Sequence, residues 1–213
     1  MKLYNMNLSN FATKCRIAIY DKGAQVEIVS VPNNDSHSPE YRKIYPFGKV
    51  PCLDADGMII GESETINEYL EEKFPTPALL PKSAEARARV RSFTRFHDLY
   101  LEPPLRALFG QMNPKTRDAS LVKEKTAEFA LQLDELEGKL ADSGYATGAD
   151  FTLADCALAP TLFFAVNLLP RFGLTPMEGR PKLSAYWSHV QTRPSVKKGL
   201  GEMAEALAAL SRR

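Results

Sequence analysis

Ser9 is the first residue whose type and position could do chemistry, because it lies immediately before a stretch with helical spacing. Its hydroxyl could simply cap the helix, which is the ordinary role of serine at such a position. The same hydroxyl could also donate a hydrogen bond to an anion, since the dipole and free N–H groups of a helix N-terminus favour negative charge. A thiolate bound there would be stabilised. One serine can fill both roles.

Val50-Pro51 stands at the start of an apolar strand candidate and is the second such feature. Proline cannot donate to a sheet, so it requires an edge, a strand start or a special conformation. From the residues alone a trans bond is the better prediction, because cis is a small minority of X–Pro bonds. A cis bond would turn the N–H and C=O of Val50 outward, where they could pair with a bound peptide.

Glu62-Ser63 follows a strand candidate and precedes a helix candidate. The simple interpretation makes Ser63 the helix N-cap. A second interpretation uses both residues: the serine hydroxyl and the helix N-terminus hold a carboxylate, while Glu62 faces an ammonium group. That pairing suits the α-amino acid end of a γ-glutamyl peptide.

Two further features predict structure rather than catalysis. Thr152 followed by Asp155 fits a helix capping box, with Phe151 as a hydrophobic staple. The three cysteines, Cys15, Cys52 and Cys156, are far apart and odd in number, with no Cys-x-x-Cys or zinc spacing. We therefore expect buried thiols in a reducing compartment and no metal site.

The elements that must position these residues alternate in the first third of the chain. The order β-α-β and then β-β-α predicts a thioredoxin-like α/β domain over residues 1–78. Asp56-Gly57 between two apolar runs predicts a hairpin. The expected elements are strands at Lys2–Asn5, Val26–Val31, Val50–Leu53 and Met58–Ile60, helices from Phe11 to Lys22 and from Ile66 to Phe74, and a loop at Pro32–Pro39. Gly23 stands where the first of these helices should end.

Beyond a proline-rich linker at Pro75–Pro81, the patterns are helical. They predict an all-α helical bundle over residues 84–213 as the C-terminal domain. Its helix candidates are Ala84–Leu101, interrupted at Pro103-Pro104, a stripe from Val122 to Leu140, and a nearly all-apolar, central helix at Ala154–Leu169.

Charge and hydropathy exclude several partners. The net charge is +1, with basic residues dispersed among acidic ones, so no nucleic-acid or anionic-membrane surface is expected. The longest apolar stretch, Ala157–Leu169, is shorter than a bilayer-spanning helix requires. The N-terminal residues show no export signal, so we expect a cytoplasmic protein.

Five motifs in register resemble the cytosolic glutathione transferase family over essentially the whole chain, with a serine-type, bacterial-like opening. They are Ser9–Ala18, Ser38–Pro51, Glu62–Leu70, Phe151–Asp155 and Trp187–Val196. The resemblance implies that Ser9 is the catalytic hydroxyl, which stabilises the thiolate of bound glutathione. It also implies that Pro51 is cis, that the Val50 backbone pairs with the cysteine of glutathione, and that Glu62 and Ser63 bind the γ-glutamyl group.

Two departures from the family pattern fall in the loop before Pro51. Tyr45 replaces the usual asparagine, which is interpreted as a loop variation without clear functional cost. Ser36 stands where some classes have a histidine for the glycine carboxylate of glutathione, and His37 stands where plant members often have a lysine. His37 and Lys49 are therefore the candidates for that carboxylate, with Lys49 preferred over His37 and a solvated loop residue as the alternative for each.

The resemblance further implies that a small hydrophobic electrophile binds beside the sulfur, against the first long helix of the second domain. Candidate contacts are Phe11, Phe93, His97, Tyr100 and Leu101, with helix packing as the alternative for the helical residues. It also implies a detoxification enzyme that acts as a homodimer. Asp98 could then approach the glutathione amino group of the partner copy.

Other functions remain open on the same scaffold. A glutathione-dependent isomerase, dehalogenase or ether-cleaving enzyme could use a serine-type site. A cysteine-type thiol transferase is disfavoured, because no thiol stands at the helix start and Cys15 lies well inside the helix. A non-enzymatic binding or regulatory protein would tend to lose the ligand-binding residues, and here they are all present.

Overall fold

The computed structural model describes residues 1–142 and 144–212. The chain divides into two compact units, one containing Met1–Leu80 together with the segment that starts at Gln191, and the other containing Pro81–Val190. The C-terminal helix therefore belongs with the first unit, although it falls inside the predicted range 84–213. The ranges 1–78 and 84–213 stay a prediction about the folding domains.

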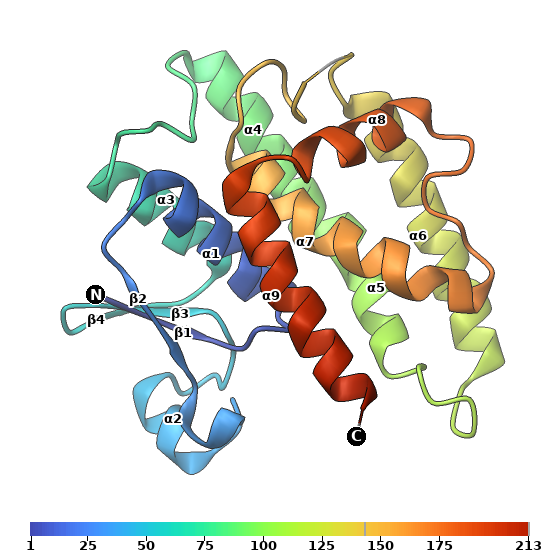
Figure 1. The fold of residues 1–213 in the computed structure, drawn as a ribbon, viewed down its shortest axis with the longest axis horizontal. Helices are drawn as coiled ribbons and strands as arrows, with labels where there is room; N and C mark the ends of the chain where they lie inside the picture. Colours follow the sequence, from blue (N-terminus) through green and yellow to red (C-terminus); the bar gives the residue numbers. More distant parts are fainter. Residues whose placement is uncertain (143, 213) are drawn as a thin grey trace. The chain divides into compact units, whose positions relative to one another are not determined.

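The first unit is built on a four-stranded sheet with the order β2-β1-β3-β4 (Figure 1). β1 and β2 are parallel, whereas β3 is antiparallel to both β1 and β4. The turn between β3 and β4 has positive φ at Asp56 (57°) and Gly57 (99°), as a two-residue hairpin requires. The strands are β1 Lys2–Asn5, β2 Glu27–Ser30, β3 Cys52–Ala55 and β4 Met58–Ile60. The predicted thioredoxin-like α/β fold is confirmed.

Four α-helices belong to this unit: α1 Asn10–Lys22, α2 Pro39–Ile44, α3 Ser63–Lys73 and α9 Pro194–Ser211, and a short 3₁₀ turn, η1, covers Pro32–Asn34. α1 ends at Gly23, whose φ of 60° is left-handed, as predicted for a helix C-cap. α2 was not predicted. Its signal was present, because Ser38 accepts from the Tyr41 N–H (3.2 Å) and Pro39 occupies the first helical position.

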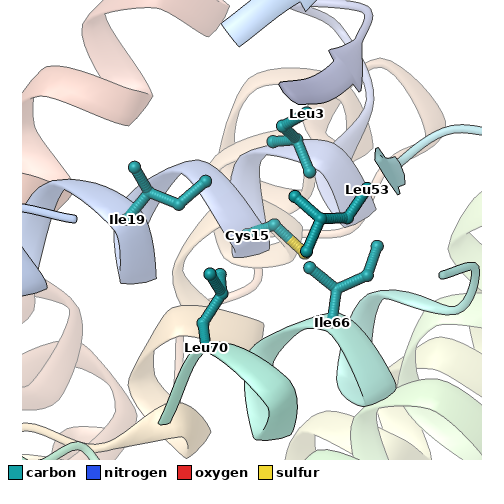
Figure 2. Close-up of a cluster of buried hydrophobic side chains, with 6 residues drawn as sticks. All are labelled: Leu3, Cys15, Ile19, Leu53, Ile66 and Leu70. Carbon is teal, nitrogen blue, oxygen red and sulfur yellow. The ribbon is translucent and has the colours of Figure 1, made fainter. Parts of the chain in front are cut away.

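A buried apolar cluster joins the sheet to α1 and α3 (Figure 2). Each fully buried aliphatic side chain of this kind stabilises the fold by about 1.5–3 kcal/mol. The cluster fixes the positions of both helices relative to β1 and β3. Its members are Leu3 and Leu53 from the sheet, Cys15 and Ile19 from α1, and Ile66 and Leu70 from α3.

The second unit is all-helical over its described residues, as predicted. Its elements are α4 Ala84–Phe96, a π-helical turn η2 at His97–Leu101, α5 Glu102–Phe109, α6 Ala119–Lys139, α7 Leu153–Leu168, a 3₁₀ turn η3 at Leu169–Phe172, and α8 Pro181–Val190.

The predicted interruption at Pro103-Pro104 lies elsewhere in the structure. The regular helix changes to the π turn at His97, and both prolines lie in the first turn of α5. Proline is tolerated there because first-turn N–H groups have no partner within their own helix.

α7 forms the centre of the helical unit, and the Thr152–Asp155 capping box at its start is present as predicted. With η3 it forms a run, Leu153–Phe172, that is long and apolar enough to cross a membrane. This run is longer than Ala157–Leu169, the apolar stretch that the sequence predicts to be too short to span a bilayer. However, 83% of that run is buried inside the protein itself. This is the burial of a core helix.

Candidate functional site

Ser9 is the N-cap of α1, as the sequence predicts. Its φ and ψ are extended (−84°, 117°), and its Oγ accepts a hydrogen bond from the Ala12 N–H at 3.2 Å. Across residues 1–142 and 144–212, the Ser9 hydroxyl proton has no acceptor. The side chain is half-buried. The hydroxyl is therefore oriented by the helix and still has a proton to donate to a ligand.

The Val50–Pro51 bond is cis, which the residues alone did not predict and the family resemblance did. The Tyr41 hydroxyl donates to the C=O of Lys49 at 2.7 Å and so supports the segment just before it. In the part of the chain that the structure describes, the backbone N–H and C=O of Val50 have no hydrogen-bond partner. They are available to an extended peptide.

Glu62 and Ser63 differ from the simple N-cap interpretation. Glu62 occupies the N-cap of α3 with φ 60° and ψ 115°, and Ser63 is the first residue of the helix, so Ser63 as N-cap was wrong. A positive φ is unfavourable for a residue with a Cβ, and such strain is retained mainly at functional sites. Glu62 is exposed, whereas Ser63 is buried.

Helix α1 holds the residues after Glu62 in place through two contacts. Lys14, whose side chain is fully buried, forms an ion pair with Glu64 (Nζ to Oε2, 2.7 Å). The Cys15 thiol donates to the C=O of Ser63 at 3.3 Å. The helix that carries Ser9 therefore also positions the residues after Glu62.

The sheet topology places these segments at one edge. Ser9 follows the C-terminal end of β1, and the antiparallel β3 begins at that edge, directly after Pro51. Since β4 is antiparallel to β3, it ends at the same edge, just before Glu62. β2 is parallel to β1, so the loop that carries His37 also starts there. Three separated motifs thus converge on one side of the unit.

His37 and Lys49 both lie exposed in the loop before Pro51. The His37 backbone N–H donates to Asp35 Oδ1 (2.8 Å), and Arg42 Nη2 lies 3.4 Å from His37 Nδ1. Gly48 between them has φ 60°, and a Cβ there would lie 2.8 Å from the C=O of Ser36. The loop conformation therefore requires glycine, and the His37 and Lys49 side chains are exposed to solvent.

Tyr45 has a structural role that the sequence did not indicate. Its side chain is nearly buried, and its ring lies against Gly61, immediately before Glu62. A Cβ at Gly61 would lie 2.5 Å from Tyr45 Cζ and closer still to the hydroxyl oxygen. Burial raises the pKa of Tyr45 above its ordinary value, which keeps the phenol neutral. The tyrosine therefore connects the loop after α2 with the Glu62 turn.

The cysteines are free and buried, as predicted. Burial is the main cause that raises the pKa of the Cys52 thiol to about 11, so this thiol is protonated near neutral pH. Residues 1–142 and 144–212 contain no cluster of three or more His, Cys, Asp or Glu side chains that could hold a metal ion.

The candidate electrophile contacts have different environments. Phe11 in α1 is half-buried. Phe93, His97 and Leu101 are buried, and the His97 ring nitrogens lie 2.8 Å from Asp98 Oδ1 and 2.7 Å from Thr161 Oγ1. Tyr100, in contrast, is 57% exposed. Burial of the three residues favours the packing alternative for them, whereas Phe11 and Tyr100 keep accessible surface.

Comparison with protein-family models gives two matches. A model described as "Glutathione S-transferase, N-terminal domain" matches residues 3–78, and one described as "Glutathione S-transferase, C-terminal domain" matches residues 119–186.

Individual proteins are similar over nearly the whole chain. Glutathione S-transferase 3 of Zea mays is 31% identical over 209 residues, covering 93% of this chain and 92% of the maize protein. A stringent starvation protein A homolog of Coxiella burnetii is 30% identical over 204 residues, covering 95% of this chain and 92% of that protein. The holo structure of maleyl pyruvate isomerase, a bacterial glutathione S-transferase in the Zeta class, is 28% identical with a TM-score of 0.78, covering 93% and 96%.

Proposed function

We propose a reaction for this chain, which belongs to the glutathione S-transferase family and is a glutathione transferase. In this reaction the thiolate of bound glutathione attacks a carbon of a small hydrophobic electrophile. A new carbon–sulfur bond forms, and a leaving group departs or the electrons of a double bond move onto the electrophile. The observation that carries the proposal is the Ser9 hydroxyl at the start of α1, with its proton available.

Ser9 supports the thiolate in two ways. Its hydroxyl donates a hydrogen bond to the sulfur, and the N-terminus of α1 adds a favourable dipole. Each unit by which the thiol pKa falls corresponds to about 1.4 kcal/mol of preference for the thiolate. The population of the nucleophile near neutral pH increases accordingly.

The remaining site residues are proposed to bind the three parts of glutathione. The Val50 backbone pairs with its cysteine, an arrangement supported by its N–H and C=O, which have no partner among residues 1–142 and 144–212. Glu62 and Ser63 bind the γ-glutamyl end, which the exposed carboxylate and the helix start support. His37 and Lys49 are candidates for the glycine carboxylate because both are exposed cations or potential cations in the adjoining loop.

For the electrophile, we propose two separate candidate contacts with accessible apolar surface, Phe11 in the first unit and Tyr100 in the second. Phe93, His97 and Leu101 would shape the surroundings of Tyr100 through packing rather than direct contact. Substitution of Tyr100 should therefore alter the preference among electrophiles, while leaving the affinity for glutathione unchanged.

A second candidate reaction is glutathione-dependent isomerisation. The similarity to the Zeta-class maleyl pyruvate isomerase, 28% identical over 93% of this chain, favours it over dehalogenation or ether cleavage. A non-enzymatic binding or regulatory role on the same scaffold is a further alternative. We also propose a cytoplasmic homodimer with a detoxification role, on the family resemblance.

The experiment that tests the proposal has two stages. Calorimetry with glutathione should show specific binding, and no response of the folded protein at millimolar glutathione would contradict it. A panel of electrophiles is then incubated with enzyme and glutathione, and the products are identified by mass spectrometry. A covalent glutathione adduct supports conjugation, whereas a product of unchanged mass with glutathione regenerated supports isomerisation.

A further inference from the structure

Arg16 forms hydrogen bonds that join residues 7–13, here called the Ser9 segment, to α9. It lies in α1, and its side chain is 1% exposed. Its Nη2 donates to the C=O of Asn7 (3.0 Å) and to Thr13 Oγ1 (2.5 Å), and its Nη1 donates to Asn7 Oδ1 (3.3 Å). One guanidinium thus contacts both the loop before Ser9 and the helix after it.

Thr13 continues this connection to Ser9 itself. Its Oγ1 accepts from Arg16 and donates to the C=O of Ser9 at 2.9 Å. The Asn7 side chain is fixed as well, because Asn5 Nδ2 donates to Asn7 Oδ1 at 2.8 Å. The backbone on which the Ser9 hydroxyl stands is therefore held through Asn7 and Thr13, and both contact Arg16.

Glu202 of α9 is the counterion of Arg16. Its carboxylate also accepts from the Tyr20 hydroxyl at 2.8 Å. α9 can approach α1 this closely because it has Gly199 at the contact, where a Cβ would lie 2.9 Å from Ile17 Cγ1. Removal of the Glu202 carboxylate would leave the buried Arg16 charge uncompensated, which destabilises the folded protein. Arg16 would then have to move toward other acceptors.

We propose that Glu202 is a positioning residue for the Ser9 hydroxyl and acts through Arg16 and Thr13. The proposal rests on the proposed role of Ser9 toward the glutathione thiolate. With Glu202 in place, the planar guanidinium has one acceptor on α9 and the others on the Ser9 segment, in a fixed geometry. Without the carboxylate, the guanidinium turns toward water, and the bonds to Asn7 and Thr13 weaken together.

The test is the pKa of enzyme-bound glutathione, measured by thiolate absorbance in the ultraviolet, in wild type and Glu202→Gln. Loss of a negative charge alone would lower this pKa, because the remaining Arg16 charge favours a thiolate. Misplacement of the Ser9 hydroxyl raises it. We expect the thiol pKa to rise, kcat to fall about tenfold, and the KM for glutathione to change by less than about twofold.

Controls separate positioning from general loss of stability. Glu205→Gln makes the same change at an exposed position of α9 and should titrate like wild type. Thr13→Val removes the hydroxyl bonds to the Ser9 carbonyl and Arg16, while the Thr13 backbone N–H still donates to the same carbonyl at 2.9 Å. The thiol pKa should rise in Thr13→Val and should stay at the wild-type value in Thr13→Ser. These two variants decide the question if Glu202→Gln does not fold.

The proposal is overturned if folded Glu202→Gln has an unchanged or lowered thiol pKa, or if Thr13→Val titrates like wild type. Ser9→Ala is measured in parallel. If Ser9→Ala raises the thiol pKa and Glu202→Gln does not, the positioning role alone is wrong. If Ser9→Ala itself titrates like wild type, the proposed role of Ser9 fails.

Discussion

The hydroxyl of Ser9 is oriented by its own helix. The Ala12 N–H donates to one lone pair of the oxygen, so the hydroxyl proton is left available on another side of it. Capping and catalysis are therefore compatible here, because capping needs only a lone pair and thiolate stabilisation needs only the proton.

Ser9→Ala should leave the fold and the affinity for glutathione nearly unchanged and should lower turnover. Loss of one oriented donor to an anion reduces the rate by about 10²–10³-fold where it dominates, and a partly exposed sulfur that recruits water brings the loss toward the lower value. The apparent pKa of the bound thiol should move upward, toward that of free glutathione. Thiolate absorbance against pH measures this shift. Normal turnover with a wild-type titration would make Ser9 a cap only.

Glu62→Gln should weaken glutathione binding by about tenfold. The rate at which bound glutathione reacts should fall much less. The neutral amide keeps the shape of the side chain but loses the charge that attracts an ammonium group, and solvent exposure limits the size of the effect. Calorimetry gives the affinity, and single-turnover kinetics gives the rate. Glu72→Gln, at an exposed position of α3, is the matched control. Equal losses in both variants would contradict the assignment.

At the scale of elements, the contact between Tyr45 and Gly61 couples the loop after α2 to the turn before α3. The tyrosine occupies the space that a side chain at position 61 would need. Because Glu62 adopts positive φ directly after this glycine, a displacement here changes the direction of its carboxylate.

Gly61→Ala should therefore weaken glutathione binding by about tenfold, because the methyl group displaces Tyr45 or the Glu62 turn. Tyr45→Asn, which introduces the residue usual in the family, should be tolerated and should recover much of the affinity in the double variant. A double-mutant cycle measured by calorimetry quantifies the coupling. Purely additive effects of the two substitutions would show that the contact does not control the turn.

The capping box of α7 predicts a separate effect on stability. Asp155 is fully buried and accepts from the N–H of Ala146 (2.8 Å), the N–H of Thr152 (2.8 Å) and the Thr152 hydroxyl (3.1 Å). Asp155→Asn places an amide NH₂ against some of these donors. The free energy of unfolding should fall by about 2 kcal/mol at pH 7, as measured by urea denaturation. Asp150→Asn, an exposed change just before the helix, should have little effect.

This loss of stability should depend on pH. Burial is the main cause that raises the pKa of Asp155 from 3.8 to about 6. Between these values the folded state binds more protons than the unfolded state, so the contribution of Asp155 to stability falls as pH rises through this window. The difference between wild type and Asp155→Asn should consequently be larger at pH 4 than at pH 7. A difference that grows with pH would show that the hydrogen bonds outweigh burial.

The sequence predicted the elements whose signals are local. The Asp56-Gly57 turn, the Gly23 cap and the Thr152–Asp155 box each depend on neighbouring residues. α2 was missed because six residues carry too little periodicity, although Ser38-Pro39 marked its start. The positive φ of Glu62 was not predictable, since the backbone conformation there is imposed by tertiary contacts.

Contacts between distant positions were also beyond the sequence. Tyr45 and Gly61, or Arg16 and Glu202, meet only because the sheet and α9 bring them together. The site residues at the sheet edge were named from their motifs, whereas the residues that support them became visible only in the structure. Side-chain type identifies chemistry, and the fold identifies the groups that position it.

At the scale of the whole molecule, exposed apolar side chains suggest that one chain is not the complete assembly. Phe47 is 71% exposed in the loop before Pro51 of the first unit, and Leu99 is 51% exposed in the π turn beside Asp98 of the second unit. Each is a large apolar side chain that an interface with a second copy could bury. In a two-fold dimer the same surface of both copies lies in the interface, so each of these side chains would be buried once in each copy.

We therefore expect multi-angle light scattering at micromolar concentration to give twice the mass of one chain. Phe47→Ser should raise the dimer dissociation constant at least about tenfold, because a buried aromatic anchor contributes strongly to an interface. Leu210→Ser, a change of another apolar side chain that is more than half exposed, near the end of α9, should leave the dimer intact. If Asp98 approaches the glutathione of the partner copy, Asp98→Asn should weaken glutathione binding in the dimer and have no effect in monomeric Phe47→Ser. A wild-type protein that scatters only as a monomer would contradict both the dimer and the role of Asp98.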